Sequence, residues 1–390
     1  MARTRIRLSQ VGGNSVLISY KNGSEVGRIE QDNNSSGVVI LRDRCDDSTG
    51  STTDHPLEIT KYDNSGLHPL DGSNHDPFGN EVVYQSWFPT TMYTSLSHLA
   101  TSAASVTSDA TKALARTNPG RTTVSVPNFI HELKDLPGMY RDILGLKAQI
   151  YNLKNIQRYN PRVWANHSLS VQMGWLPLFS DLRKLITFQS SVDQRVQELH
   201  RLYDNGGLKR RINLGKFGAQ DSASLIVESA AGTLGLVIAK RSKATSVERW
   251  ATVRWKPTSL PKSHSPEELQ RQARQLVFGL GNGISAQQAW NAIPWTWLID
   301  WFANVDEFLG AHQNSVPVKA GLVNVMTRTT TTADFKRTDS LGGIKGGDGT
   351  SKLTTKARSQ SGGGLSVGLP FLNGRQLSIL GALAIQRMKR

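Results

Sequence analysis

The sequence predicts an α+β protein in which antiparallel strands alternate with helices along 390 residues. Three observations support this fold class: period-two segments joined by short turns, two long stretches of helical periodicity, and no strand–helix–strand rhythm of the kind that builds parallel sheets. Long helical insertions separate the β segments. We therefore expect one antiparallel sheet built from discontinuous segments, with the helices gathered at one end.

The N-terminal part of the chain has the pattern of β structure. Residues 15–20 and 25–30 flank Asn22-Gly23, the strongest short hairpin signal, because both turn residues adopt positive φ. Residues 43–80 are rich in Asp, Ser, Asn, Gly and Pro, and this composition predicts long loops.

Helical periodicity dominates the middle of the chain. Residues 127–160 place apolar side chains at spacings of three and four, and a second helix follows Pro177. The apolar stripe of the second helix includes Val192, Val196 and Leu199, and the helix is expected to end near a glycine pair. Its basic residues fall largely off that stripe: Arg183, Lys184, Arg195 and Arg201.

Period two returns over residues 208–256, and a capped helix follows. Ser265 can accept a hydrogen bond from the first turn, Pro266 suits the first helical position, and Glu268 stands where a capping box requires it. These three residues predict the start of a helix.

The C-terminal part predicts two strands and a last helix. Residues 323–332 and 352–359 have strand character, and GGIKGGDG (342–349) between them predicts a flexible loop by composition. Residues 375–390 form an apolar helix with a basic end.

The net charge of +15 is unevenly distributed. Residues 1–100 carry 8 Lys or Arg against 12 Asp or Glu, whereas residues 205–262 carry 11 against 3 and residues 312–390 carry 12 against 3. Mixed charges suffice for solubility, so a one-sided excess in two segments favours a polyanionic partner. Because Lys and Arg release condensed counterions when they neutralise phosphates, nucleic acid is the expected partner.

Few residues fit an enzyme or a metal site. The chain has one cysteine, Cys45, and nine scattered histidines, so neither a disulfide nor a metal site is expected, and no cofactor is predicted. Residues 364–368 match the Gly-x-Ser-x-Gly pattern of a hydrolase nucleophile at Ser366. Such a hydrolase needs an acid and then a histidine after the serine, but the last histidine is His312 and no Asp or Glu follows Asp348. The basic N-terminus lacks the apolar run of a secretory signal.

Residues 289–302 read AWNAIPWTWLIDWF, with four tryptophans and a single carboxylate, Asp300. The 25 residues before Asp300 carry no charge, yet their Gln, Asn, Gly and Pro argue against a membrane span. A helix continued from Pro294 to Phe308 would be apolar nearly all round, with Trp297 on one stripe, and this predicts a packing wall. Base stacking would need interleaved Lys or Arg. Asp300 is expected to find a basic or hydrogen-bonding partner.

Two segments have counterparts in a known family. IPWTWLIDWF (Ile293–Phe302) and GWLPLFSDLRKL (Gly174–Leu185) resemble the P-[FY]-[ST]-F-V-V-D-W and G-[WL]-[LM]-P-L-x-x-D-[IL] motifs of maturation proteins from single-stranded RNA bacteriophages, the leviviruses. The apolar, basic-ended segment Leu377–Arg390 is a weaker match. The family often has Trp-Leu-Glu before the second motif, where this chain has Ser-Leu-Ser (168–170), so contacts of that Trp or Glu are not carried over. The matching residues are Gly174, Trp175, Pro177, Asp181, Pro294, Trp297, Asp300 and Trp301.

The resemblance implies a non-enzymatic structural protein, present as one monomer in an icosahedral virion assembled in the bacterial cytoplasm. In that family the protein replaces a coat-protein dimer, binds the 3′ region of the genomic RNA and attaches the particle to a bacterial pilus. The family's shape is elongated, with a helical region near the capsid and RNA and a β region that projects towards the pilus. The regions expected here are 1–95, 208–262 and 315–372 for the β region, and 96–207, 263–314 and 373–390 for the helical region.

RNA recognition is expected to rest on phosphate contacts and on the shape of a folded hairpin. The side chains expected on a basic face near the RNA are Arg183, Lys184, Arg195, Arg201, Lys209, Arg210, Arg211, Arg387, Lys389 and Arg390. The alternatives are a cellular RNA-binding protein of α+β fold, which would function without coat protein, and an unrecognised hydrolase.

Overall fold

The computed structural model describes residues 2–33, 38–48, 55–93, 96–121, 165–166, 168–169, 171–172, 188–229, 235–258, 265–278, 300, 303–312, 316–364 and 374–387. The chain divides into two compact units, each assembled from three separate stretches of sequence. Unit 1 comprises Met1–Ser105, Asn213–Ala251 and Asn324–Gln360, and unit 2 comprises Val106–Ile212, Thr252–Val323 and Ser361–Arg390.

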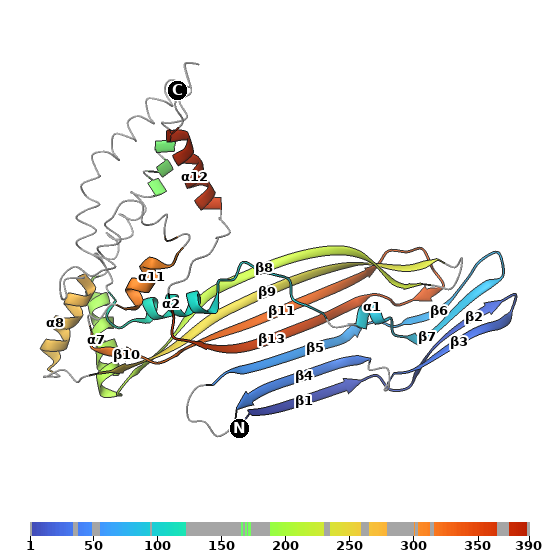
Figure 1. Ribbon diagram of the computed structural model, residues 1–390, viewed down its shortest axis with the longest axis horizontal. Helices are drawn as coiled ribbons and strands as arrows, with labels where there is room; N and C mark the ends of the chain where they lie inside the picture. The colour runs from blue at the N-terminus through green and yellow to red at the C-terminus, as the bar shows by residue number, and fades with distance from the viewer. Residues whose placement is uncertain are drawn as a thin grey trace, which may run out of the picture. The chain divides into compact units, whose positions relative to one another are not determined.

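Strands outnumber helices in the described part of the chain (Figure 1). The strands are β1 Ala2–Gln10, β2 Asn14–Lys21, β3 Ser24–Asp32, β4 Val39–Ser48, β5 Leu57–Leu67, β6 Leu70–His75, β7 Asn80–Trp87, β8 Leu208–Ser229, β9 Leu236–Pro257, β10 Val318–Ala320, β11 Val323–Arg337, β12 Ile344–Lys345 and β13 Gly349–Ser361. The helices are α1 Thr90–Tyr93, α2 Val106–Thr117, α7 Phe188–Asp204, α8 Pro266–Phe278, α11 Val305–Ala311 and α12 Gly374–Arg387.

The strands form two antiparallel sheets. The eight-stranded sheet has the order β1-β4-β5-β13-β11-β9-β10, with β8 paired to β9, and the five-stranded sheet has the order β12-β6-β7-β2-β3. The predicted α+β class, with antiparallel strands from distant segments, is confirmed. Two sheets form instead of the single one expected, because β5 ends in one sheet at Leu67 and β6 begins in the other at Leu70.

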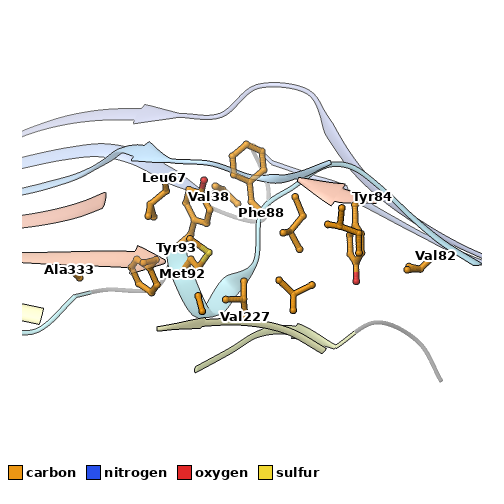
Figure 2. Packing of buried hydrophobic residues seen from close by; sticks show 14 residues of the cluster. Val38, Leu67, Val82, Tyr84, Phe88, Met92, Tyr93, Val227 and Ala333 are labelled. Atoms are coloured by element: carbon orange, nitrogen blue, oxygen red, sulfur yellow. The ribbon is translucent and has the colours of Figure 1, made fainter. Parts of the chain in front are cut away.

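Both sheets contribute to one apolar cluster in unit 1 (Figure 2). Leu70, Val82 and Tyr84 of the five-stranded sheet are 0%, 0% and 1% exposed, and Val237 and Ala333 come from the eight-stranded sheet. Side chains of α1 complete the cluster. Burying each large apolar side chain contributes about 1.5–3 kcal/mol, so this cluster is a major source of stability for unit 1.

The prediction of long loops over residues 43–80 is wrong. Most of this stretch lies in β4, β5 and β6. Strand β5 is paired on both sides, with Asp43 opposite Lys61 and Lys61 opposite Thr354. Polar residues in this segment alternate with buried ones along a half-exposed sheet, and composition does not reveal a strand whose partner is distant in sequence.

The glycine-rich stretch 342–349, predicted to be a flexible loop, includes strand β12, which pairs with β6. Ile344 is 3% exposed and belongs to the apolar cluster. Gly346 has a φ of +80°, and a Cβ on it would lie 1.7 Å from the carbonyl oxygen of Pro69. Glycine is therefore required here by the close approach of two backbones.

Several local signals are confirmed. Asn22 and Gly23 have φ values of +48° and +79° and join β2 to β3. The Oγ of Ser265 accepts a hydrogen bond of 3.2 Å from the backbone N–H of Glu268 at the start of α8. Gly206, just after α7, has a φ of +62°. Strands β11 and β13 and helix α12 lie where the sequence predicts them.

Unit 2 contains helices α2, α7, α8, α11 and α12. Helix α7 packs against α8, and α2 packs against α11. Val192 and Leu199 of α7 are each 0% exposed, and Leu269 of α8 is 1% exposed, which fits the predicted apolar stripe. The helix predicted within residues 127–160 and the start of the helix after Pro177 lie outside the described residues.

We predict that Gly346→Ala lowers the free energy of unfolding by about 2 kcal/mol or more, because alanine must adopt positive φ and overlap a neighbouring carbonyl. Gly342→Ala is the matched control, since nothing lies within 4 Å of a Cβ placed there, and it should change the value by about 0.5 kcal/mol or less. Urea unfolding followed by circular dichroism measures both. Equal effects of the two substitutions would contradict the close approach.

Candidate nucleic-acid interface

Arg195 lies on α7 with a side chain that is 4% exposed. Its Nη1 donates to Oε2 of Glu198 at 2.7 Å, and its Nη2 donates to the backbone carbonyl of Arg121 at 2.8 Å. A longer contact of 3.4 Å joins Nη1 to the carbonyl oxygen of Pro119. Burial lowers the pKa of Arg195 to about 10 and the Glu198 carboxylate opposes this shift, so the group stays charged at neutral pH.

Arg210 on β8 shares the same carboxylate. Its Nη2 pairs with Oε1 of Glu198, and its Nη1 donates to the carbonyl oxygen of Thr117 at 3.2 Å. Desolvation lowers the pKa of Arg121 nearby, and the positive charge of Arg210 acts in the same direction. These guanidinium groups therefore tie the chain after α2 to α7 and β8 within unit 2.

The prediction that Arg195 lies off the apolar stripe of α7 is wrong. It follows Val192 by three residues and precedes Leu199 by four, so it occupies the buried face of the helix. The alternation of strand β8 explains why Arg210 is only 13% exposed. Both side chains are occupied by contacts inside unit 2 and do not form an exposed basic face.

Three of the predicted RNA-binding side chains are exposed. Arg201 lies on the outer side of α7, and Lys209 and Arg211 flank Arg210 on the opposite face of β8. Their contact with RNA stays a prediction. Arg387 lies in the last turn of α12, where only the backbone is described. The remaining predicted RNA-binding and motif residues lie outside the described residues: Arg183, Lys184, Lys389, Arg390, Gly174, Trp175, Pro177, Asp181, Pro294, Trp297 and Trp301.

Asp300 has the hydrogen-bonding partner that the sequence predicts. Its Oδ1 accepts a hydrogen bond of 3.0 Å from the backbone N–H of Asp306, in the first turn of α11. Asn304 at the N-cap makes no side-chain cap bond, so Asp300 supplies the acceptor from four residues further back. The predicted continuous helix from Pro294 to Phe308 is wrong, because residues 303–304 are not helical and a new helix begins at Val305.

The sequence prediction included basic residues of β8 but missed those on β5 and β13 of the same eight-stranded sheet. Lys352 and Lys356 on β13 and Lys61 on β5 are exposed. In a strand, residues four apart point to the same side. Because that segment was predicted to be a strand, the spacing of Lys352 and Lys356 could have predicted that both lysines share one face of the sheet.

The exposed lysine and arginine side chains can attract an anionic partner electrostatically. No set of three or more His, Cys, Asp or Glu side chains among the described residues is arranged to hold a metal ion. Within the same part of the chain, no helix has the length and apolar character needed to cross a membrane.

No protein-family model matches the chain, and no curated protein sequence matches it.

We predict that substitutions at two arginines on α7 affect different properties, one the stability of the fold and the other the salt dependence of RNA binding. Arg195→Gln should lower the free energy of unfolding by about 3 kcal/mol, because it removes one partner of a buried ion pair, and should leave the salt dependence of RNA binding unchanged. Arg201→Gln should change stability by about 0.5 kcal/mol or less and reduce the slope of log K against log salt by about 0.7. A reduced slope for Arg195→Gln at full stability would overturn the structural role of Arg195.

Proposed function

We propose that this chain is a maturation protein of a single-stranded RNA phage. In this role it is a non-enzymatic virion component that binds genomic RNA, takes a place among coat-protein dimers and attaches the particle to a bacterial pilus. The observation that carries the proposal is the pair of motifs Gly174–Leu185 and Ile293–Phe302, which occur in the family's order. The α+β fold and the antiparallel strands from distant segments are compatible with it.

The charge distribution supports the RNA-binding part of the proposal. The net charge is +15, and the excess falls in residues 205–262 and 312–390. Cations there neutralise phosphates and displace counterions, which makes binding strongly dependent on salt. Within the predicted RNA-binding set, Arg201, Lys209 and Arg211 are the members whose side chains are described and exposed.

An exposed aromatic side chain supports attachment through unit 1. Phe78, in the turn between β6 and β7, is 72% exposed. The Oδ1 of Asp76 accepts hydrogen bonds of 2.9 Å from the backbone N–H groups of Phe78 and Asn80, and Nζ of Lys21 donates to the Phe78 carbonyl at 3.0 Å. A ring on a fixed turn loses little freedom when it enters a partner's apolar pocket, and such aromatic residues often dominate protein interfaces.

Co-expression with a coat protein and a genomic RNA of this phage class tests the proposal. Purified particles should contain one copy of the chain per particle, crosslinked to RNA, and should adsorb to piliated cells but not to cells without pili. RNA binding without entry into particles would support the cellular RNA-binding alternative instead. Hydrolytic activity that Ser366→Ala abolishes would support the hydrolase.

The same particles test the attachment site. Phe78→Ala should reduce adsorption about tenfold, the effect of losing about 1.4 kcal/mol of binding energy, and should leave RNA packaging unchanged. Leu322→Ala removes a side chain that is 59% exposed in unit 2 and is the matched control. Equal adsorption of both variants would exclude Phe78 as an attachment contact.

A further inference from the structure

Strands β1, β4, β5 and β13 are neighbours in the eight-stranded sheet (Figure 1). Arg7 is opposite Asp43, Asp43 is opposite Lys61, and Lys61 is opposite Thr354. Directly opposed residues of antiparallel strands point to the same side, as do residues two apart along a strand. The register therefore fixes which side chains share this face.

Exposed cations dominate this face. The side chains of Arg3, Arg5 and Lys61 are 46%, 56% and 48% exposed. We call the following exposed set the basic face: Arg3, Arg5, Arg7, Lys61, Lys352 and Lys356. Along β1 the three arginines repeat about every 6.8 Å. Lys61 on β5 lies two strands from β1, about 10 Å, and the two lysines of β13 lie three strands away, about 14 Å, so the positive charge is spread over three of the four strands.

The other face of the same strands is directed inward near the middle of the sheet. Tyr62 and Leu353 are directly opposed, and each is 8% exposed. Ser351, on the same side as Leu353, is 1% exposed. Because side chains alternate along a strand, the neighbours Lys61 and Lys352 must point to solvent.

Carboxylates on the basic face do not cancel its charge. Asp43, Asp47 and Asp63 are the acidic residues on this face of the four strands where they are described, so six cations face three carboxylates. Asp47 pairs with Arg3 at 3.1 Å and Arg5 at 2.6 Å. The hydrogen bond from Arg3 is the main cause that lowers the pKa of Asp47. The surroundings of this face thus favour negative charge.

The Asp63 carboxyl shows the same preference for negative charge. Burial alone would raise the pKa of Asp63, but hydrogen bonds from Ser65 and the charge of Lys61, 3.6 Å away, outweigh it and lower the pKa. An added anion on this face would meet uncompensated cations.

We propose that the basic face binds the phosphate backbone of single-stranded RNA without reading its bases. No aromatic side chain lies on this face of the four strands within the described residues, so base stacking is not available to it. A lipid surface would also require exposed apolar side chains beside the cations. Leu41, Leu57 and Ile59 on this face are half-buried, and the exposed Ile6 and Leu8 of β1 point to the opposite face. The inference rests on the proposed RNA-binding function and adds to it a second RNA site on unit 1, in strands that the resemblance alone would assign to the pilus-facing β region.

A triple substitution tests this site. Lys61→Gln, Lys352→Gln and Lys356→Gln together should reduce the slope of log K against log salt for a single-stranded RNA by about 2, since each lost phosphate contact contributes about 0.7. The reduction should be the same for RNAs of different sequence. Arg28→Gln, Arg271→Gln and Arg274→Gln together remove three exposed cations that lie outside this face and outside the two basic segments, and should leave the slope unchanged. Unchanged thermal unfolding confirms that both variants are folded.

Cys45 provides an independent probe, because it is the only cysteine in the chain and lies on the same face, with its Sγ 3.3 Å from Nη2 of Arg5. A photoreactive maleimide attached to Cys45 should crosslink to RNA in the assembled particle. Crosslinks to coat protein alone, or to anionic lipid vesicles and not to RNA, would overturn the proposal.

The outcomes separate this inference from the proposed function. If the wild-type chain shows no salt-dependent RNA binding, the proposed function itself fails. If the wild-type chain binds and the triple variant of the basic face keeps the full slope, only the second site is excluded, and the cations of α7 and β8 remain the candidate contacts.

Discussion

The apolar cluster where the two sheets of unit 1 meet fixes the orientation of every strand around it. Only two residues separate β5 from β6, so the register of one sheet sets where the other begins. A slip of one residue would turn each strand's buried side chains outward. Leu70 and Tyr84 stay in the cluster only in the observed register. The outward direction of Lys61 and Lys352 follows from the burial of their neighbours Tyr62 and Leu353 on the other side of β5 and β13, so the proposed RNA-binding face depends on buried side chains that do not lie on it.

The two kinds of basic residue in this chain are used differently. Arg195 and Arg210 are buried in unit 2, where a planar guanidinium can satisfy one carboxylate and several backbone carbonyls at once. Lys352 and Lys356 carry compact, strongly hydrated charges and stay in water. A count of basic residues along the sequence therefore overestimates the number of accessible cations on α7 of unit 2. The same count underestimates the number of accessible cations on the eight-stranded sheet.

Features set by a few adjacent residues could be predicted from the sequence. The hairpin at Asn22-Gly23, the cap at Ser265 and a hydrogen-bonding partner for Asp300 all depend on local chemistry, and all are present. Features set by distant partners could not. Residues 43–80 form strands because β5 finds β13 almost three hundred residues later, and Arg195 is buried because of what packs over α7. The charge excess in the sequence indicated a polyanionic partner, but which cations share one face of the sheet could be known only from the strand register.

The close contact between Gly346 and Pro69 has a practical consequence for anyone who modifies this protein. Composition alone would recommend the glycine-rich stretch 342–349 as a place to insert an affinity tag or to open a circular permutant, since such stretches usually tolerate extra residues. Here the backbone at Gly346 lies in close contact with the Pro69 carbonyl, and Ile344 is part of the apolar cluster of unit 1. Extra residues would therefore disrupt the pairing of β12 with β6. A tag is better placed at the exposed connection between β1 and β2, where nothing lies within 4 Å of a Cβ on Gly12.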